Sequence, residues 1–280
     1  MLIRCWGARG SIPVSGPEYL KYGGDTTCLE IRTAEDDIII VDAGSGIRRL
    51  GNRLLAEGRF EYHLVFTHSH WDHILGFPFF KPIYRRETVI HMCGCPFNKG
   101  SVRDMIAKVM ASPNFPVDYS KVQARISYLE SCRSAFAVRS LTVDPVPASH
   151  PDSGVGYKFA ENGKTFVFLT DNELTYRHPG GLDFADYVRF AAGADLLFHD
   201  SEFTEEEYRT MKTWGHSTYR AALQLALDAG VKKFGLFHHN QERTDAAIDE
   251  IVEKCRRIVG AQKSPLECFA VQEGMEIRLE

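Results

Sequence analysis

The sequence predicts a mixed α/β protein built from layered sheets. Three observations favour this class. Short apolar or β-branched runs recur along the chain, helical periodicity separates many of them, and Asn162-Gly163 lies between two alternating runs. Asn-Gly supplies the positive φ angles of a two-residue hairpin turn. Strands that stand alone at first and are later interleaved with helices are typical of mixed α/β architectures.

The expected strands are runs in which apolar residues alternate or continue over a few positions. In chain order they are Leu2 to Trp6, Thr26 to Thr33, Asp37 to Asp42, Tyr62 to Thr67, Thr88 to Met92, Phe136 to Val146, Val155 to Ala160, Thr165 to Thr170, Asp195 to Phe198, Lys233 to Phe237, Glu267 to Val271 and Met275 to Leu279.

The expected helices have apolar residues at spacings of three and four. They are Ile47 to Glu57, Val102 to Met110, Leu182 to Ala192, Ser217 to Ala229 and Thr244 to Ile258. The last two also show boundary signals. Ser217 is placed to cap the first of these two helices, Gly230 follows its end, and Thr244 precedes the next.

No internal repeat, low-complexity tract or long linker divides the 280 residues, so we expect a single domain over residues 1–280. The segment at about 93–135 is the most irregular and contains Ser112-Pro113-Asn114-Phe115-Pro116. We expect it to form an inserted lid or arm.

Composition and charge disfavour two classes of protein, nonspecific nucleic-acid binders and membrane or secreted proteins. The net charge of -4 and the pI of about 6.3 are unlike those of a protein that grips nucleic acid nonspecifically. Neither a membrane-spanning apolar run nor a signal-peptide core is recognisable, so we expect a cytoplasmic protein with no membrane partner.

The seven cysteines are odd in number and scattered, which favours reduced thiols over a disulfide framework. His91-Met92-Cys93-Gly94-Cys95 is the one dense group of ligand-type residues among them. It has no second Cys/His cluster at zinc-ribbon spacing, so core packing is the favoured interpretation.

The densest group of ligand-type residues is THSHWDH, residues 67–73, directly after an apolar run. Residues two apart on an extended segment point the same way, so His68 and His70 can face one metal ion. Asp72 and His73 follow after the chain has turned and can address a second ion. Imidazole and carboxylate ligands suit zinc, manganese or iron, and the lack of cysteine indicates an open, catalytic site.

An isolated histidine is more often a surface or hydrogen-bonded residue than a ligand, and His63, His91 and His178 are interpreted in that way. The same interpretation does not suit residues 67–73. Several imidazoles and a carboxylate buried without a cation would leave polar atoms that a strand-end loop cannot pair.

This motif and its setting resemble the metallo-β-lactamase fold superfamily, and the resemblance extends through most of the chain. The resemblance implies a four-layer αββα sandwich, in which two mixed sheets are flanked by helices. It also implies two divalent metal ions, with zinc expected first and manganese or iron as alternatives. Two cations that share a carboxylate lower the pKa of a bound water, so a hydrolase is expected.

The resemblance supplies further ligands from later strand ends. His150 in Ala148-Ser149-His150 looks like the third histidine of the first metal, and Asp171 looks like the carboxylate that bridges both metals. His238 looks like the last ligand of the second metal, although its neighbour His239 competes for that role. Asp42 matches an aspartate that orients the metal-binding loop without ligating.

Trp214-Gly215-His216-Ser217-Thr218 resembles the histidine motif of the ribonuclease Z and cyclic-nucleotide phosphodiesterase-like branch. There the histidine assists the leaving oxygen as an acid, so we assign catalytic roles to His216, to Asp200 beside it, and to Asp72, which would combine ligation with proton handling. Ser217 is a candidate substrate contact. Arg9, in a first loop that looks like that of the same branch, is another, although a structural role is favoured for it.

The leading function is therefore a dinuclear-metal phosphodiesterase acting on a small or cyclic nucleotide or a related phosphodiester. A ribonuclease Z-like RNA 3′-end endonuclease is the alternative, so RNA stays open as a partner, as does a homodimer. No long basic, glycine-rich arm for transfer RNA is recognisable. A lactonase or thioesterase, and a non-catalytic metal-based nucleotide or oxygen sensor, are further alternatives. A stacking wall for a nucleobase formed by Trp71, Phe77, Phe79, Phe80 and Tyr84 competes with plain core packing.

Overall fold

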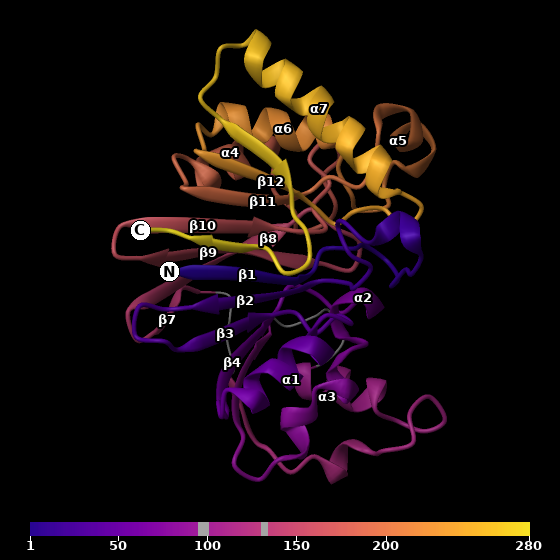
Figure 1. Cartoon of the computed structure of the whole chain (residues 1–280), viewed down its shortest axis with the longest axis vertical. Helices are drawn as coiled ribbons and strands as arrows, with labels where there is room; N and C mark the ends of the chain where they lie inside the picture. Colours follow the sequence, from indigo (N-terminus) through magenta and orange to yellow (C-terminus); the bar gives the residue numbers. More distant parts are fainter. Residues whose placement is uncertain (95–100, 130–133) are drawn as a thin grey trace.

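Two seven-stranded sheets stack face to face at the centre of the molecule (Figure 1). The computed structural model describes residues 1–94, 101–129 and 134–280. The first sheet has the order β14-β1-β2-β3-β4-β5-β6, and the second has the order β13-β12-β11-β10-β9-β8-β7. The C-terminal strand β14 returns to the first sheet and pairs antiparallel with β1.

Each sheet joins an antiparallel half to a parallel half. The strands of the first sheet are β1 (Leu2–Gly7), β2 (Cys28–Arg32), β3 (Ile38–Val41), β4 (Glu61–Phe66), β5 (Val89–Gly94), β6 (Arg125–Leu129) and β14 (Glu276–Arg278). Pairing is antiparallel from β14 to β3 and parallel from β3 to β6.

The second sheet repeats this division. Its strands are β7 (Phe136–Val138), β8 (Leu141–Ala148), β9 (Gly154–Glu161), β10 (Lys164–Leu169), β11 (Leu196–Asp200), β12 (Lys233–Phe237) and β13 (Glu267–Ala270). Pairing is antiparallel from β7 to β10 and parallel from β10 to β13. Lys164 pairs with Glu161, so Asn162-Gly163 forms the predicted two-residue turn.

Helices cover the outer face of each sheet. The α-helices are α1 (Ile47–Ala56), α2 (Trp71–Ile74), α3 (Val102–Val109), α4 (Phe184–Ala191), α5 (Glu205–Met211), α6 (Tyr219–Asp228) and α7 (Asp245–Ala261), and the 3-10 helices are η1 (Pro17–Tyr19), η2 (Phe77–Phe79), η3 (Lys81–Tyr84) and η4 (Tyr119–Lys121). Helices α1 and α3 share a core with the first sheet, and α4, α6 and α7 share one with the second.

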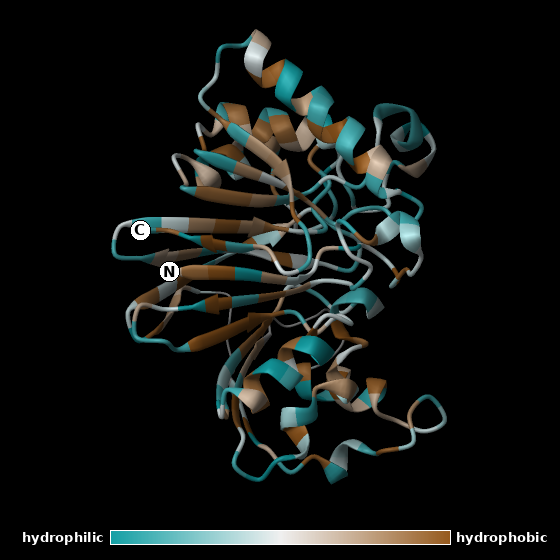
Figure 2. Ribbon diagram, viewed as in Figure 1, coloured by the Kyte–Doolittle hydropathy of each residue, from teal (hydrophilic) through white to brown (hydrophobic). Residues whose placement is uncertain are grey.

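A third apolar core lies between the two sheets and contains Val41, Val65, Phe166, Phe168 and Phe198. Brown, hydrophobic segments therefore run through the strands of both central layers (Figure 2). Burying apolar side chains on both faces of each sheet is the main favourable contribution to this packing. The predicted αββα arrangement of two mixed sheets is confirmed.

Three local expectations need correction. The run from Phe136 to Val146 is two strands, because Arg139 and Ser140 form a tight turn with a positive φ of 48° at Arg139. Arginine does not signal a turn, and a single serine is a weak turn signal. Helix α5 was not predicted because none of its residues is buried, so it lacks an apolar period. The side chain of Thr218, not Ser217, caps α6 by accepting a hydrogen bond from the Ala221 backbone N–H.

The segment predicted as a lid or arm is in part an element of the first sheet. Strand β6, also absent from the prediction, pairs parallel with β5 and forms the sheet edge. The preceding helix α3 starts at a capping box formed by Ser101 and Asp104. Residues 95–100 and 130–133, including Cys95, lie outside the described residues. Among the residues described, no helix has the length and apolar character needed to span a bilayer.

Candidate metal centre and active site

The candidate site lies at one edge of the sandwich, where parallel strands end. Asp42 follows β3, His68 follows β4, Asp171 follows β10, Asp200 ends β11 and His238 follows β12. The carboxyl ends of parallel strands are the usual location of ligand sites in α/β sheets. The two sheets therefore bring side chains from distant parts of the sequence to one place.

Three of these residues leave their strands in a left-handed conformation. The φ angle is 62° at Asp42, 49° at Asp171 and 58° at His238. Positive φ is uncommon outside glycine and clusters at functional sites. It redirects each chain sharply at the strand end, so simple strand alternation does not predict where these side chains point.

A first group consists of His68, His70, His150 and Asp171. Each offers one ligand-type nitrogen or oxygen, and these four atoms lie within 4.8 Å of one another. His70 Nδ1 is 3.1 Å from His150 Nε2, and Asp171 Oδ1 is 3.4 Å from His68 Nε2. His70 is exposed, whereas the other three residues are buried. The group therefore opens to solvent on the side of His70.

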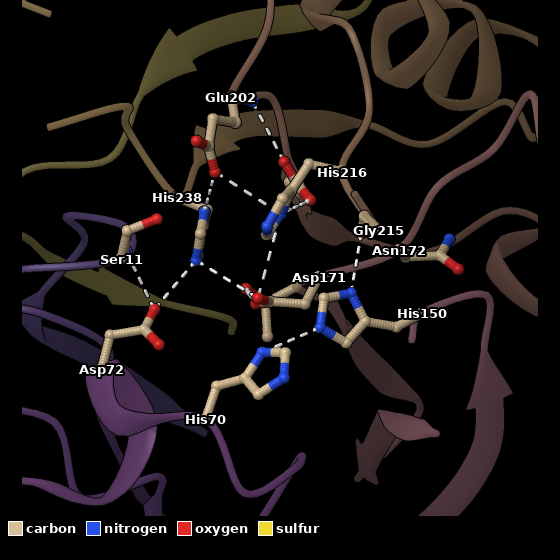
Figure 3. Close-up of polar contacts among 12 residues, drawn as sticks. Ser11, His70, Asp72, His150, Asp171, Asn172, Glu202, Gly215, His216 and His238 are labelled. Atoms are coloured by element: carbon tan, nitrogen blue, oxygen red, sulfur yellow. Dashed lines mark hydrogen bonds and ion pairs between the residues drawn. The ribbon is translucent and has the colours of Figure 1, made fainter. Parts of the chain in front are cut away.

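A second group consists of Asp72, His73, Asp171 and His238, which meet the same limit of 4.8 Å and are all buried. Asp72 Oδ2 is 3.1 Å from both His73 Nε2 and His238 Nε2. Asp171 Oδ2 is 3.2 Å from His73 Nε2, while its Oδ1 is 3.3 Å from His238 Nε2. Asp171 is common to both groups and lies between them (Figure 3).

Hydrogen bonds at Nδ1 orient four of the imidazoles. The acceptors are Asp42 for His73 (2.8 Å), Glu202 for His238 (2.9 Å), the Gly215 carbonyl for His150 (2.9 Å) and Thr67 Oγ1 for His68 (3.1 Å). Because a carboxylate or carbonyl only accepts, Nδ1 of His73, His238 and His150 carries a proton, and Nε2 is the nitrogen that would meet a metal. This is the arrangement in which a protein presents histidine to a metal.

Two polar atoms of the cluster are otherwise unexplained. Nε2 of His68 and Nε2 of His73 are buried and form no hydrogen bond among the described residues. Burial lowers the pKa of His68 well below its ordinary value and that of His150 to about 3, so both imidazoles are neutral at pH 7. His68 is thus a neutral imidazole with an unpaired buried nitrogen, which fits a divalent cation.

The buried carboxylates of the site also favour bound cations. Asp42, Asp72, Asp171, Asp200 and Glu202 are all buried. Burial disfavours ionised carboxylates, but nearby His73 and His238 hold the pKa of Asp72 and of Asp171 well below their usual range. So much buried negative charge requires positive charge beside it, and divalent cations would supply it.

His216 lies beside the second group, and with Asp200, Glu202 and His238 it forms a third buried set of ligand-type atoms within 4.8 Å of one another. Its Nδ1 is 2.8 Å from Asp200 Oδ2 and 3.5 Å from Glu202 Oε2, and its ring stacks on His238 at 4.7 Å between centroids (Figure 3). Burial opposes protonation, but the carboxylates of Glu202 and Asp200 raise the pKa of His216 to about 9. Burial raises the pKa of Asp200 itself. His216 therefore carries a proton at neutral pH beside the ligand cluster.

A family model described as a beta-lactamase superfamily domain matches residues 38–239. The chain belongs to the beta-lactamase superfamily. This confirms the predicted family and the prediction of a superfamily hydrolase. The superfamily fold implies divalent metals, and the two ligand groups supply suitable residues for them.

Relatives and similar structures agree with this membership. Ribonuclease Z of Haloarcula marismortui is 26% identical over 290 positions, which cover 88% of this chain and 89% of that protein. The metallo-beta-lactamase fold protein YhfI of Bacillus subtilis superposes with a TM-score of 0.71 at 14% identity over 99% of both chains. A diphosphatase of the PhnP family gives a TM-score of 0.70 at 16% identity, covering 100% of this chain and 98% of that one.

Within this superfamily fold, several predicted site residues come together and others do not. His68, His70, Asp72, His73, His150, Asp171 and His238 form the two groups, with Asp42, Asp200 and His216 in contact with them. His239 points away and its Nε2 bonds the Val271 carbonyl at 2.8 Å. Of the two adjacent histidines, only His238 lies in the ligand groups.

The two candidate substrate contacts, Arg9 and Ser217, make structural contacts in this fold, which is the role favoured for Arg9 from the sequence. The Arg9 side chain is 1% exposed and donates to the backbone carbonyls of Gly23, Asn240 and Arg243, which leaves it no access to a phosphate. Ser217 is also buried, and its Oγ donates to the Asn172 carbonyl and accepts from Leu174 N–H. Both residues hold loops together through these hydrogen bonds to backbone groups.

The N-terminal loop contributes through its backbone. Ser11 N–H donates to Asp72 Oδ2 at 3.0 Å, which fixes this carboxylate (Figure 3). A Cβ at Gly10 would lie 2.4 Å from the His238 ring, so only glycine allows the loop to approach so closely.

Two buried acids were missed from the sequence. Glu202 accepts from His238 and is close to His216, and Glu173 accepts from the backbone N–H groups of Thr213 and Gly215 at 2.8 Å each. Each lies two residues beyond a predicted site residue, Asp200 or Asp171. Asp171 has a positive φ, so this spacing does not place Glu173 on the face of Asp171, and no local signal marks either acid as buried.

Proposed function

We propose that this protein is a metal-dependent phosphodiesterase with a dinuclear site, acting on a small or cyclic nucleotide or a related phosphodiester. The observation that carries the proposal is the position of His216. A proton-bearing imidazole, held by Asp200, lies directly against a cluster suited to two cations. Cleavage of a phosphodiester releases an oxygen that benefits from a positioned proton donor.

The two ligand groups provide a place for each cation. His68, His70 and His150 would hold one, Asp72, His73 and His238 the other, and Asp171 would contact both. Divalent cations bound in such a pair supply Lewis-acid activation of water and stabilise the charge that develops at phosphorus. Zinc is our first choice because imidazole dominates the ligands, with manganese or iron as alternatives.

The residues of the chain would perform the remaining steps. His216 donates its proton to the leaving oxygen, and Asp200 and Glu202 keep the imidazole charged and oriented before it does so. Asp72, fixed by the Ser11 N–H, is positioned to accept a proton from the attacking water. Asp42 and Glu202 hold His73 and His238 in the required tautomer.

A ribonuclease Z-like endonuclease is the second candidate, favoured by the 26% identity to the archaeal ribonuclease Z. A protein that grips RNA needs basic side chains along the path of its backbone. The described pocket beside His70 instead contains one lysine, Lys108, and two aspartates, Asp104 and Asp152. This balance of charge supports a small substrate over a long RNA.

A panel of substrates distinguishes the phosphodiesterase from the ribonuclease Z-like endonuclease. Purified protein loaded with zinc or manganese is incubated with bis(p-nitrophenyl) phosphate, cyclic nucleotides, a precursor tRNA and a β-lactam, and kcat/KM is measured for each. We expect turnover of the small diesters and little of the tRNA or the lactam. Efficient cleavage of tRNA alone would favour the second candidate, and nucleotide binding without any turnover would favour a sensor.

A further inference from the structure

A pocket of about 740 Å³ opens beside His70, between α2 and the segment that contains α3. His70 is the exposed member of the first ligand group, so the pocket is continuous with the open side of the candidate metal centre. The volume lies within the usual range for small-molecule sites, about 300 to 1,000 Å³. It would admit a group of roughly nucleoside size.

One side of the pocket is aromatic. Trp71, inside the THSHWDH motif, is 81% exposed, and Phe79 is 52% exposed. Phe115 meets Phe79 edge-to-face at 5.5 Å between ring centroids. Large aromatic side chains left in contact with solvent inside a concavity indicate a surface that a ligand covers. Phe77 and Phe80, by contrast, are fully buried and belong to the core, which corrects the wider stacking wall expected from the sequence.

The rim of the same pocket is polar. Lys108 forms no salt bridge, and the Asn114 side chain forms no hydrogen bond, among the residues that the structure describes. Both residues are exposed, and an acyl chain in the pocket would offer them no hydrogen-bond acceptor. A heterocyclic base would stack on the aromatic side and offer acceptors at its edge.

We propose that this pocket binds the nucleobase of the substrate and that Trp71 is the surface on which the base stacks. The inference rests on the phosphodiesterase function proposed above, because the phosphate must lie at the metal centre while its base occupies the pocket. It narrows the substrate to nucleotide diesters of about mononucleotide size. Stacking on an aromatic side chain contributes about 1 to 3 kcal/mol per base.

Calorimetric titration of the metal-loaded full chain with adenosine 5′-monophosphate and with ribose 5-phosphate tests the proposal. The two probes share the sugar phosphate and differ in the base. We expect the wild type to bind the nucleotide at least tenfold more tightly. Trp71→Ala should weaken nucleotide binding by about 5- to 150-fold, the equivalent of the stacking contribution, and leave ribose 5-phosphate unchanged.

Three variants control for indirect effects, and metal content is measured for each. Trp71→Phe should retain most of the preference for adenosine 5′-monophosphate over ribose 5-phosphate. Phe79→Ala should lose part of this preference without altering the metal-binding motif. Trp214→Ala removes another exposed tryptophan, 60% exposed, that does not line the pocket, and should leave the preference intact.

The proposal is overturned if the wild type binds both probes equally or neither, or if Phe79→Ala and Trp71→Phe weaken both probes to the same extent. The proposed function fails separately. If bis(p-nitrophenyl) phosphate is not hydrolysed although the base-dependent preference is present, the pocket stands and the phosphodiesterase does not. If the diester is hydrolysed but the nucleotide is not preferred over ribose 5-phosphate, the phosphodiesterase stands and the nucleobase pocket does not.

Discussion

Asp171 and His216 illustrate how differently two residues of one site act. Asp171 is shared by both ligand groups, with its two oxygens 3.2 to 3.4 Å from nitrogens of His68, His73 and His238. His216 lies 3.9 Å from Asp171 but is held by Asp200 instead. Removing a ligand and removing the proton donor should therefore have separable effects.

His70→Ala should remove metal and activity together, because it deletes one ligand of the first group. His216→Ala should keep the metal content and lower kcat by about 10² to 10⁴, the usual range for general acid catalysis. Metal analysis and kinetics on the same preparations check both. His91→Ala, a histidine outside the ligand groups, is the matched control. Loss of metal from the His216 variant would contradict its assignment as a proton donor.

Sequence patterns identified some residues of the site but not others. His68, His70, Asp72 and His73 stand in one motif, so spacing alone identified them. Asp171, His150 and His238 are isolated in sequence, and only the resemblance to a family selected them. Glu173 and Glu202 were missed because a single acid after a strand is usually solvated, and nothing local indicates that it will be buried.

At the scale of elements, the loop before α6 couples two parts of the site. Glu173 holds the Thr213 and Gly215 N–H groups, the Gly215 carbonyl accepts from His150, and His216 follows. Gly215 has a φ of 94°, and a Cβ there would lie 2.0 Å from His150 Nδ1. One loop thus orients a ligand and carries the proton donor. Sequence analysis identified its histidine but not its anchor, because Glu173 acts across 42 residues.

Gly215→Ala should lower the affinity of the first metal site by about 10- to 100-fold, because the methyl group displaces the His150 ring and its carbonyl acceptor. Calorimetric metal titration measures this effect. Gly230→Ala is the matched control, since Gly230 also has a positive φ, 62°, but has open space around it. That control should cost about 1 to 2 kcal/mol of stability and no metal affinity. Equal metal affinity in the two variants would show that the contact with His150 is unimportant.

At the scale of the whole molecule, the fold places the site by bringing two parallel half-sheets to one edge. Alternation of apolar residues predicted most strands, and the order of strands and helices predicted the mixed class. The pairing of β14 with β1 did not follow from local pattern, because it joins the ends of the chain. The sharp turns at Asp42, Asp171 and His238 did not follow from local pattern either, since a positive φ is uncommon for aspartate and histidine.

The central claim is that this edge holds two divalent cations that together support cleavage of a phosphodiester. Activity toward bis(p-nitrophenyl) phosphate, measured as zinc or manganese is added back to metal-free protein, tests it most directly. We predict that the rate rises until about two equivalents per chain are bound and then remains constant. Full activity of the metal-free protein, or saturation with metal that leaves the diester uncleaved, would contradict the account.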